Sequence, residues 1–156
     1  MDDGMPVVGY APEEIQTGEP TRSARLKWVV VVDEALPAGL IVNAAVCVAA
    51  ATGAGVPGLL GPDAKDAAGD LHPGLPWAGC TILAASSSQI VEIRTRAAAA
   101  EEVFVADMAG LAQRTRVYDG YLEQMSAAAE LDYCAVSLIG PRKRIDGIVR
   151  GLSLLA

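Results

Sequence analysis

The pattern of hydrophobic and polar positions divides the chain into strands that alternate with helices. The run from Trp28 to Val32, four valines after a tryptophan, is typical of a strand buried on both faces. Shorter apolar runs predict three further strands, at residues 80–84, 103–106 and 133–139. Apolar residues at helical spacing and helix-start signals predict helices at residues 37–52, 86–100, 115–129 and 141–151. This alternation indicates an α/β sheet covered by helices on both faces.

The segments outside this pattern are rich in glycine and proline. Residues 1–23 mix these two residue types with acidic ones and predict an irregular N-terminal arm. Residues 61–76 predict a loop built from ordered turns. Because the chain has 156 residues, we expect one domain, residues 24–156, behind the arm.

Composition and charge exclude several classes of function. Hydrophobic residues make up 52% of the chain, and the net charge of -7 argues against a protein that grips nucleic acid by its phosphates. The longest apolar stretch, residues 36–56, is rich in alanine and glycine and carries Asn43, so we expect no membrane span. The acidic N-terminus lacks the features of a secretory signal, which favours a cytoplasmic location.

The cysteines and the lone histidine predict neither a metal site nor a cofactor. Cys47, Cys80 and Cys134 are widely spaced, and no paired Cys-x-x-Cys motif occurs. An odd number of cysteines fits a reducing cytoplasm better than a disulfide framework. We expect all three to be small buried hydrophobic residues.

Two turns follow strands and open helices, where backbone N–H groups favour anions. They are residues 33–39 after the first strand and residues 140–144 after the fourth. The second turn contains three adjacent cations, Arg142, Lys143 and Arg144. These side chains either bind an anionic group or form a solvated face.

Four polar side chains are candidates for catalysis, each with a structural alternative. His72 is either a general base in its loop or a hydrogen-bonded strut. Asp107, after the third strand, is either a buried acceptor or a cap of the next turn, and Asp33 is favoured at a helix start by the dipole in any case. Asn43, in an otherwise apolar helix, either satisfies a buried backbone group or faces a pocket.

Several short motifs, in this order, resemble those of the family called domain of unknown function two thousand. The resemblance runs from about Thr21 to the C-terminus. The motifs that carry it are Lys27 to Asp33, Leu36 to Gly39, Asn43 to Ala45, His72 to Gly74, Tyr118 to Tyr121, Gly140 to Lys143 and Gly151 to Leu155.

That family is similar in fold to type-2 peptidyl-tRNA hydrolases. The resemblance implies a three-layer α/β/α domain with a four-stranded mixed sheet, often a homodimer. In the hydrolases the first strand leads through a leucine and a glycine to a basic helix start and an Ala-Ala-Gln step. The positions that match the leucine, the glycine and the two alanines here are Leu36, Gly39, Ala44 and Ala45. Four other positions depart from the hydrolase pattern: where the hydrolases carry two lysines, a glutamine and a histidine, this chain has Leu40, Val42, Val46 and Ala49.

The C-terminal part of the resemblance is closer. Asp107 falls where the hydrolases carry an aspartate that ends the third strand, although a helix is inserted after it here. The other matching positions are Ile139 to Pro141, Asp146, Gly151 and Leu152. The chain thus keeps the scaffold and loses the lysine end of the hydrolase site, which argues against tRNA as a partner.

Our first hypothesis is a site in the crevice between the two turns, which binds a small and possibly anionic molecule or performs hydrolase-like acyl transfer. If the site is catalytic, His72 acts as general base, Asp107 and Asp33 orient it, and Asn43 polarises a carbonyl group. The residues expected to bind substrate are Gly39, Gly140, Arg142 and Lys143. His72, Asn43 and Asp107 should then approach one cleft.

Two alternatives remain open. One is a genuine peptidyl-tRNA hydrolase with substituted active-site residues. The other is a non-catalytic structural or regulatory homodimer.

Overall fold

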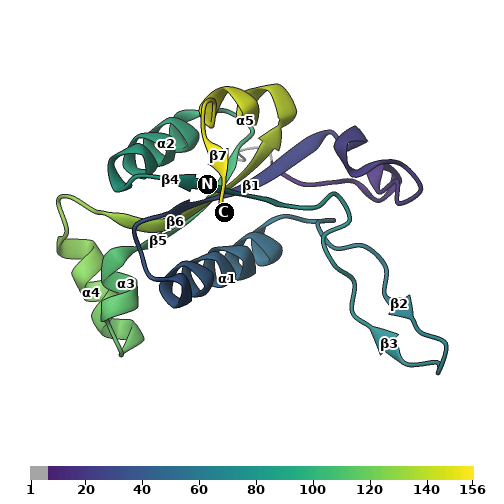
Figure 1. Ribbon diagram of the computed structural model, residues 1–156, viewed down its shortest axis with the longest axis horizontal. Helices are drawn as coiled ribbons and strands as arrows, with labels where there is room; N and C mark the ends of the chain where they lie inside the picture. The colour runs from purple at the N-terminus through teal and green to yellow at the C-terminus, as the bar shows by residue number, and fades with distance from the viewer. Residues whose placement is uncertain (1–6) are drawn as a thin grey trace, which may run out of the picture.

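The computed structural model describes residues 7–156 and contains a mixed sheet of five strands (Figure 1). In their order across the sheet, the strands are β5 (Phe104–Ala109), β6 (Tyr133–Pro141), β1 (Leu26–Asp33), β4 (Thr81–Ala85) and β7 (Ser153–Leu154). β1 runs parallel to β4, whereas β6 is antiparallel to both of its neighbours and β7 is antiparallel to β4. The sequence predicted four strands and missed β7, because a strand of two residues is too short to give a hydrophobic pattern.

Helices cover both faces of this sheet. Figure 1 shows α1 (Ala38–Gly55) on one face, and α2 (Ser87–Ala99) and α5 (Arg142–Ile148) on the other. Two hydrophobic clusters fill the spaces between the layers. The three-layer arrangement expected from the sequence is therefore present.

The valine run of β1 supplies both clusters. Val30 and Val32 pack on the α1 side, and Val29 and Val31 pack on the α2 side, because successive side chains of a strand point to opposite faces. All four are at most 1% exposed. The prediction of a strand buried on both faces is confirmed.

The helix α1 contacts the sheet through one stripe only. Ile41, Ala44, Val48 and Thr52 are its buried residues, and their spacing of three or four positions places them on one side of the helix. By length and composition α1 is also apolar enough to cross a membrane, with a mean hydropathy of 1.7.

The region after β5 differs from the expected one. Pairing with β6 continues through Asp107 to Met108, so Asp107 lies inside the strand and does not end it. A short helix, α3 (Gly110–Arg114), follows directly, and α4 (Tyr118–Ala127) begins three residues later than expected. Figure 1 shows α3 and α4 together at one end of the molecule.

The predicted loop at residues 61–76 contains a small hairpin. Its strands are β2 (Ala64–Lys65) and β3 (Leu71–His72). Asp66 shapes the turn between them, because one oxygen of its carboxylate accepts hydrogen bonds from the backbone N–H groups of Ala68 and Asp70. The hairpin projects from the end of the molecule opposite to α3 and α4 (Figure 1).

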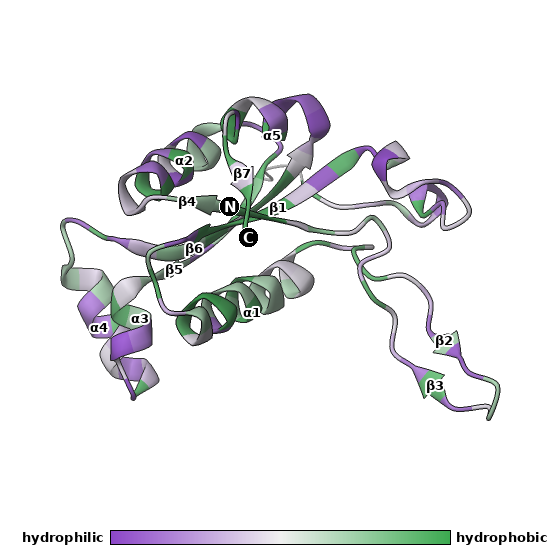
Figure 2. Cartoon of the chain, viewed as in Figure 1, coloured by the Kyte–Doolittle hydropathy of each residue, from purple (hydrophilic) through white to green (hydrophobic). Residues whose placement is uncertain are grey.

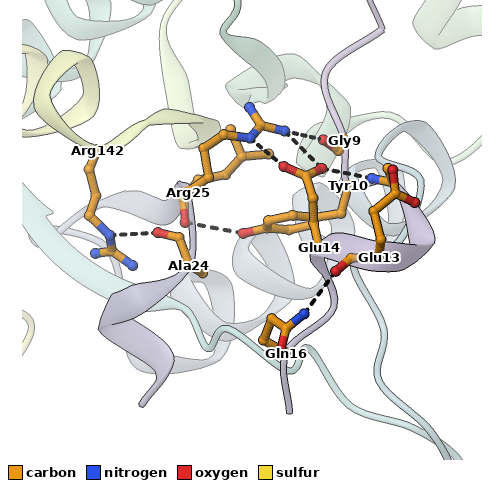
Figure 3. Close-up of polar contacts among 10 residues, drawn as sticks. Gly9, Tyr10, Glu13, Glu14, Gln16, Ala24, Arg25 and Arg142 are labelled. Atoms are coloured by element: carbon orange, nitrogen blue, oxygen red, sulfur yellow. Dashed lines mark hydrogen bonds and ion pairs between the residues drawn. The ribbon is translucent and has the colours of Figure 1, made fainter. Parts of the chain in front are cut away.

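The described part of the N-terminal arm, residues 7–23, packs against the domain. It contains two short 3-10 turns, at Pro12–Glu14 and Thr21–Ser23. The hydroxyl of Tyr10, a residue labelled in Figure 3, donates to the Leu26 carbonyl at the start of β1, at 3.1 Å. The same view shows the Arg25 side chain joined to the Glu14 carboxylate. Residues 1–6 of the expected arm lie outside the described residues.

Candidate functional site

The two turns expected to form one crevice lie at opposite ends of the sheet. The antiparallel pairing of β1 and β6 sets Leu26 beside Pro141, while Asp33 is at the other end of β1. The eight residues of β1 give seven steps of extended strand between those ends, or about 23 Å. The hypothesis of a single crevice between the turns is therefore wrong, because the local sequence pattern does not reveal strand direction.

The second turn, residues 140–144, holds the N-terminal segment against the domain through hydrogen bonds. The Arg142 guanidinium donates to the backbone carbonyls of Ala24 and Thr21, at 2.9 and 3.1 Å (Figure 3 shows the first of these). Arg144 contacts the Glu102 carboxylate at 3.7 Å, and Lys143 is exposed. A Cβ atom at Gly140 would come within 2.9 Å of the Glu102 carbonyl, so close packing explains that glycine.

His72 lies far from the other candidate catalytic residues. It belongs to the projecting hairpin, its side chain is 61% exposed, and its Nε2 atom is 3.2 Å from the Asp66 carboxylate. The structure does not bring it to a cleft with Asn43 and Asp107. The arrangement matches the hydrogen-bonded strut that was the structural alternative.

Replacing Asp66 with alanine should loosen the hairpin, whereas Asp70→Ala should not. The hydrogen bond to His72, with those from nearby backbone N–H groups, holds the pKa of Asp66 below its ordinary value. The turn is therefore fully ordered above the ordinary carboxyl pKa of about 4, and its order is lost as pH falls through the lowered pKa. Amide hydrogen exchange at residues 66–72, measured against pH, checks this. Equal exchange in the two variants would contradict it.

The other candidates gather near the carboxyl ends of β1 and β5. Asp33 accepts a hydrogen bond from the backbone N–H of Ala35, at 3.0 Å, and so caps the turn before α1. Asn43 is exposed on α1, and its side-chain oxygen is 3.5 Å from the Gln113 amide nitrogen. Gln113 also donates to the Leu40 carbonyl at 2.9 Å, which fastens α3 to α1. Gly39 is exposed on the first turn of α1.

The thiol of Cys134 lies in the same region and is poorly suited to act as a nucleophile. It donates to the side-chain oxygen of Gln113 at 3.2 Å. Burial raises the pKa of Cys134, and the nearby carboxylates of Asp132 and Asp33 raise it further. Since the thiolate is the reactive form, the arrangement disfavours cysteine chemistry at neutral pH.

The expectation that all three cysteines are buried is correct only for Cys134. Cys47 is exposed, because it lies on the side of α1 that faces away from the sheet, and Cys80 is exposed just before β4. An apolar sequence context alone does not place a residue in the core.

A groove of about 390 Å³ lies between β5, α1 and α4. We call it the β5–α4 groove, and its lining residues are Cys47, Asp107, Met108, Ala112, Thr115, Arg116, Tyr118 and Tyr121. It is located at the edge of the sheet where β5 ends, and it reaches the middle of α1 at Cys47. Of the site residues predicted from the sequence, Asp107 lines this groove.

The negative charge of Asp107 is balanced by an arginine of α2, on the face of the sheet opposite to α1. Its carboxylate is 3.2 Å from the Arg94 guanidinium of α2, and its side chain is 18% exposed. Arg94 also lies over the ring of Tyr133, 5.7 Å from the ring centre. Asp107 therefore acts as a partly buried acceptor, one of the two roles expected for it.

The wall of the groove contributed by α4 carries two tyrosines one helical turn apart. The rings of Tyr118 and Tyr121 meet edge to face, with their centres 5.4 Å apart. Burial, with the neighbouring Tyr118 and Asp107, raises the pKa of Tyr121, so its hydroxyl is a neutral hydrogen-bond donor and acceptor at pH 7.

Arg116 lines the groove beside these rings. Within residues 7–156, no hydrogen bond or ion pair joins its guanidinium to another residue. The sequence pattern does not mark Arg116, Tyr118 or Tyr121 as site residues. The available signal was an arginine two residues before an i, i+3 tyrosine pair at a predicted helix start, which a solvated helix also shows.

No group of three or more acidic, cysteine or histidine side chains that could hold a metal ion occurs in the described part of the chain. The groove itself offers one carboxylate and one thiol. Its lining therefore combines aromatic and apolar surface with one free cation and hydroxyl groups.

The chain is similar to one protein family and to one solved structure, as follows. A family model described as "Protein of unknown function (DUF2000)" matches residues 26–156. A solved structure of a protein of unknown function, Atu0240 from Agrobacterium tumefaciens strain C58, has a TM-score of 0.79 at 17% sequence identity. The match covers 85% of this chain and 98% of that one, so it shows a shared fold. No curated protein is significantly similar to the chain.

Proposed function

The chain belongs to the DUF2000 family of proteins of unknown function, and from this premise we propose that it binds a small molecule in the β5–α4 groove. The ligand has a flat apolar body and one anionic group. The carrying observation is the composition of the lining, in which Arg116 has no partner among the described residues and stands beside the Tyr118 and Tyr121 rings.

The position of the groove supports this proposal. In α/β sheets, ligands favour the crevice beyond the carboxyl ends of the strands. β1, β4 and β5 all end at this edge, because β5 and β1 are both antiparallel to β6. A volume of about 390 Å³ is within the range of pockets that hold small molecules.

Different lining residues can recognise different parts of the ligand, which also supports the proposal. Tyr118 and Met108 offer apolar surface for a flat ring, and the Tyr121 hydroxyl can hydrogen-bond to a polar substituent. The Arg116 guanidinium suits a carboxylate or phosphate, to which it can donate two parallel hydrogen bonds.

The proposal is binding rather than acyl transfer. Hydrolysis needs a nucleophile within hydrogen-bond reach of a base. His72 belongs to the distant hairpin, Asp107 is paired with Arg94, and the pKa of Cys134 is raised. The proposal includes a cytoplasmic location, which the three free thiols favour.

The peptidyl-tRNA hydrolase alternative gains no support from this region. Leu40 and Val42, which replace the lysines of the hydrolase pattern, are 42% and 60% exposed. Exposed aliphatic side chains on this turn offer nothing to a phosphate backbone.

Calorimetric titration with small aromatic anions tests the proposal. Phenyl phosphate, 4-hydroxybenzoate and indole-3-acetate are suitable probes, with benzyl alcohol as a neutral comparison. We expect at least one anion to bind, and Arg116→Gln to weaken its affinity about tenfold or more through loss of a charge-assisted hydrogen bond. Tyr118→Ala should weaken it as well, because the ring loses its stacking surface.

The matched control is Arg150→Gln, which removes another exposed arginine, two residues after α5 ends on the opposite face of the sheet. Its affinity should equal that of the unchanged protein. The proposal is rejected if no probe binds, or if both arginine variants weaken binding equally, since that would indicate only a general effect of net charge.

A further inference from the structure

The strand β5 has a neighbouring strand on one side only. It stands at the end of the strand order and pairs with β6. Within residues 7–156, no hydrogen bond from outside the sheet reaches the backbone of residues 104–109. The backbone N–H and carbonyl groups on the outer side of β5 are therefore free to pair with another strand.

The strand β5 also lacks the residues that usually protect an edge strand. Natural edge strands are commonly very short, or they carry lysine or proline. β7, at the other edge of the sheet, has two residues, whereas β5 has six, and none of them is lysine or proline. Its one charged residue, Asp107, is paired with Arg94. Such an edge favours the addition of an extended segment as a further strand.

Two hollows lie at the two ends of this edge. One is the β5–α4 groove, where β5 ends. The other has a volume of about 430 Å³ and lies where β5 begins. We call it the α2–β5 hollow, and its lining includes Gly55, Ala98, Ala99, Glu101, Val103 and Phe104.

Both hollows open at the edge of the strand. In the β5–α4 groove, Met108 packs on the α1 side of the sheet, while Asp107 contacts Arg94 of α2. In the α2–β5 hollow, Phe104 packs on the α1 side and Val103 on the α2 side. Because successive side chains of a strand point to opposite faces, a hollow that touches both must open at the strand's edge.

The distance between the hollows matches a short extended peptide. Phe104 and Met108 are four strand steps apart, or about 13 Å. On α1, Gly55 of one hollow and Cys47 of the other are eight helical steps apart, or about 12 Å. Five residues of extended chain cover this span. Figure 2 shows α1, which borders both hollows, mostly in the hydrophobic colour, so apolar side chains suit the middle of the peptide.

The two hollows differ in charge. The Arg116 guanidinium of the β5–α4 groove has no partner among the described residues, as noted above. At the α2–β5 hollow, Arg144 pairs with Glu102, and the exposed carboxylate of Glu101 joins no ion pair within residues 7–156. An acidic side chain of a bound segment therefore suits the Arg116 end, and a basic side chain suits the Glu101 end.

We propose that β5 binds an extended segment of another protein as an additional antiparallel strand. The segment carries aspartate or glutamate at the Arg116 end and lysine or arginine four residues later, at the Glu101 end. Antiparallel pairing sets this order, because β5 runs from Glu101 toward the groove and antiparallel pairs are the more stable. A second copy of the chain is a poorer partner, since its net charge of -7 repels an equally acidic protein. The inference goes beyond the proposed function, because it needs no small molecule.

Fluorescence polarisation tests strand addition with a dye-labelled peptide, Glu-Val-Thr-Val-Lys, capped at both ends. It should bind saturably. Single N-methylation should weaken binding about tenfold or more at every second residue and have little effect at the residues between, because alternate residues of a strand direct their N–H groups to the neighbouring strand. The reversed peptide, Lys-Val-Thr-Val-Glu, should bind more weakly.

Charge reversal on the chain tests the location. Glu101→Lys should weaken binding of the peptide about tenfold or more and leave the affinity for small aromatic anions unchanged, because Glu101 does not line the β5–α4 groove. Glu92→Lys is the matched control, since Glu92 is an exposed glutamate of α2 that lines neither hollow. It should leave the affinity for the peptide unchanged. Circular dichroism confirms that both variants are folded.

Four results would overturn the inference. They are no saturable binding of the peptide, N-methylation effects that do not alternate, equal weakening by Glu101→Lys and Glu92→Lys, and sedimentation that shows the chain paired with itself while the peptide stays free. Equal binding of the reversed peptide would contradict the antiparallel order. If small anions bind and the peptide does not, this inference fails and the proposed function stands, whereas the reverse result rejects only the proposed function.

Discussion

Tyr10→Ala is expected to lower the free energy of unfolding by about 3–5 kcal/mol, the range for loss of a large buried aromatic ring. The Tyr10 ring is 6% exposed, and its centre lies 4.8 Å from that of Trp77. A residue from the N-terminal segment therefore contributes to the same cluster as β1 and α1. Urea unfolding at neutral pH gives the measurement.

Tyr10→Phe isolates the hydroxyl group and serves as the control. It keeps the ring and removes only the hydrogen bond to the Leu26 carbonyl, which costs about 1 kcal/mol. Burial also raises the pKa of Tyr10, so the neutral form is favoured in the folded state, and stability falls as pH rises past about 10. A cost for Tyr10→Ala below that of Tyr10→Phe would show that residues 7–23 are not part of the core.

Ser137→Ala is expected to cost about 2–3 kcal/mol, a large effect for the loss of one hydroxyl group. The Ser137 oxygen accepts a hydrogen bond from the Trp28 indole N–H at 2.7 Å and is 2.7 Å from the Thr52 hydroxyl. Ser137 and Thr52 are fully buried. Alanine leaves the buried indole N–H of Trp28 without an acceptor, which is more costly than removal of a satisfied pair.

Thr52→Val is the matched comparison within this polar group. Valine has nearly the shape of threonine, and Ser137 keeps its bond with Trp28 but loses Thr52 as the acceptor of its own hydroxyl, because the Thr52 hydroxyl donates to the Val48 carbonyl. We expect a loss of about 1 kcal/mol. Urea unfolding of both variants shows which substitution lowers the free energy of unfolding more. If Thr52→Val were as destabilising as Ser137→Ala, the indole bond would not be the reason for the cost.

The sequence predicted the elements well where hydrophobic periodicity determines them. β1 follows from its valine run, and α2 begins where expected because Ser86 accepts a hydrogen bond from the Gln89 backbone N–H. Periodicity contains no information on strand direction. The antiparallel pairing of β1 and β6 could therefore not be predicted, and it separates the two turns that the first hypothesis combined.

The site was harder to predict because its residues come from separate elements. Cys47, Asp107 and Tyr118 belong to α1, β5 and α4, and only the fold brings them together. His72 attracted attention as the single histidine, but its contact is local, with Asp66 six residues earlier. Hydropathy alone does not reveal which side of α1 the sheet leaves exposed, because apolar residues occur on both sides of that helix.

The most direct test of the β5–α4 groove is a titration of ¹⁵N-labelled protein with the tightest-binding aromatic anion, followed by backbone amide chemical shifts. Saturable shifts are expected at residues 107–121 and on the adjoining part of α1 around Cys47. These shifts should be absent in Arg116→Gln at the same probe concentration. Saturable shifts centred instead on residues 140–144, or no saturable shifts with any probe, would contradict this expectation.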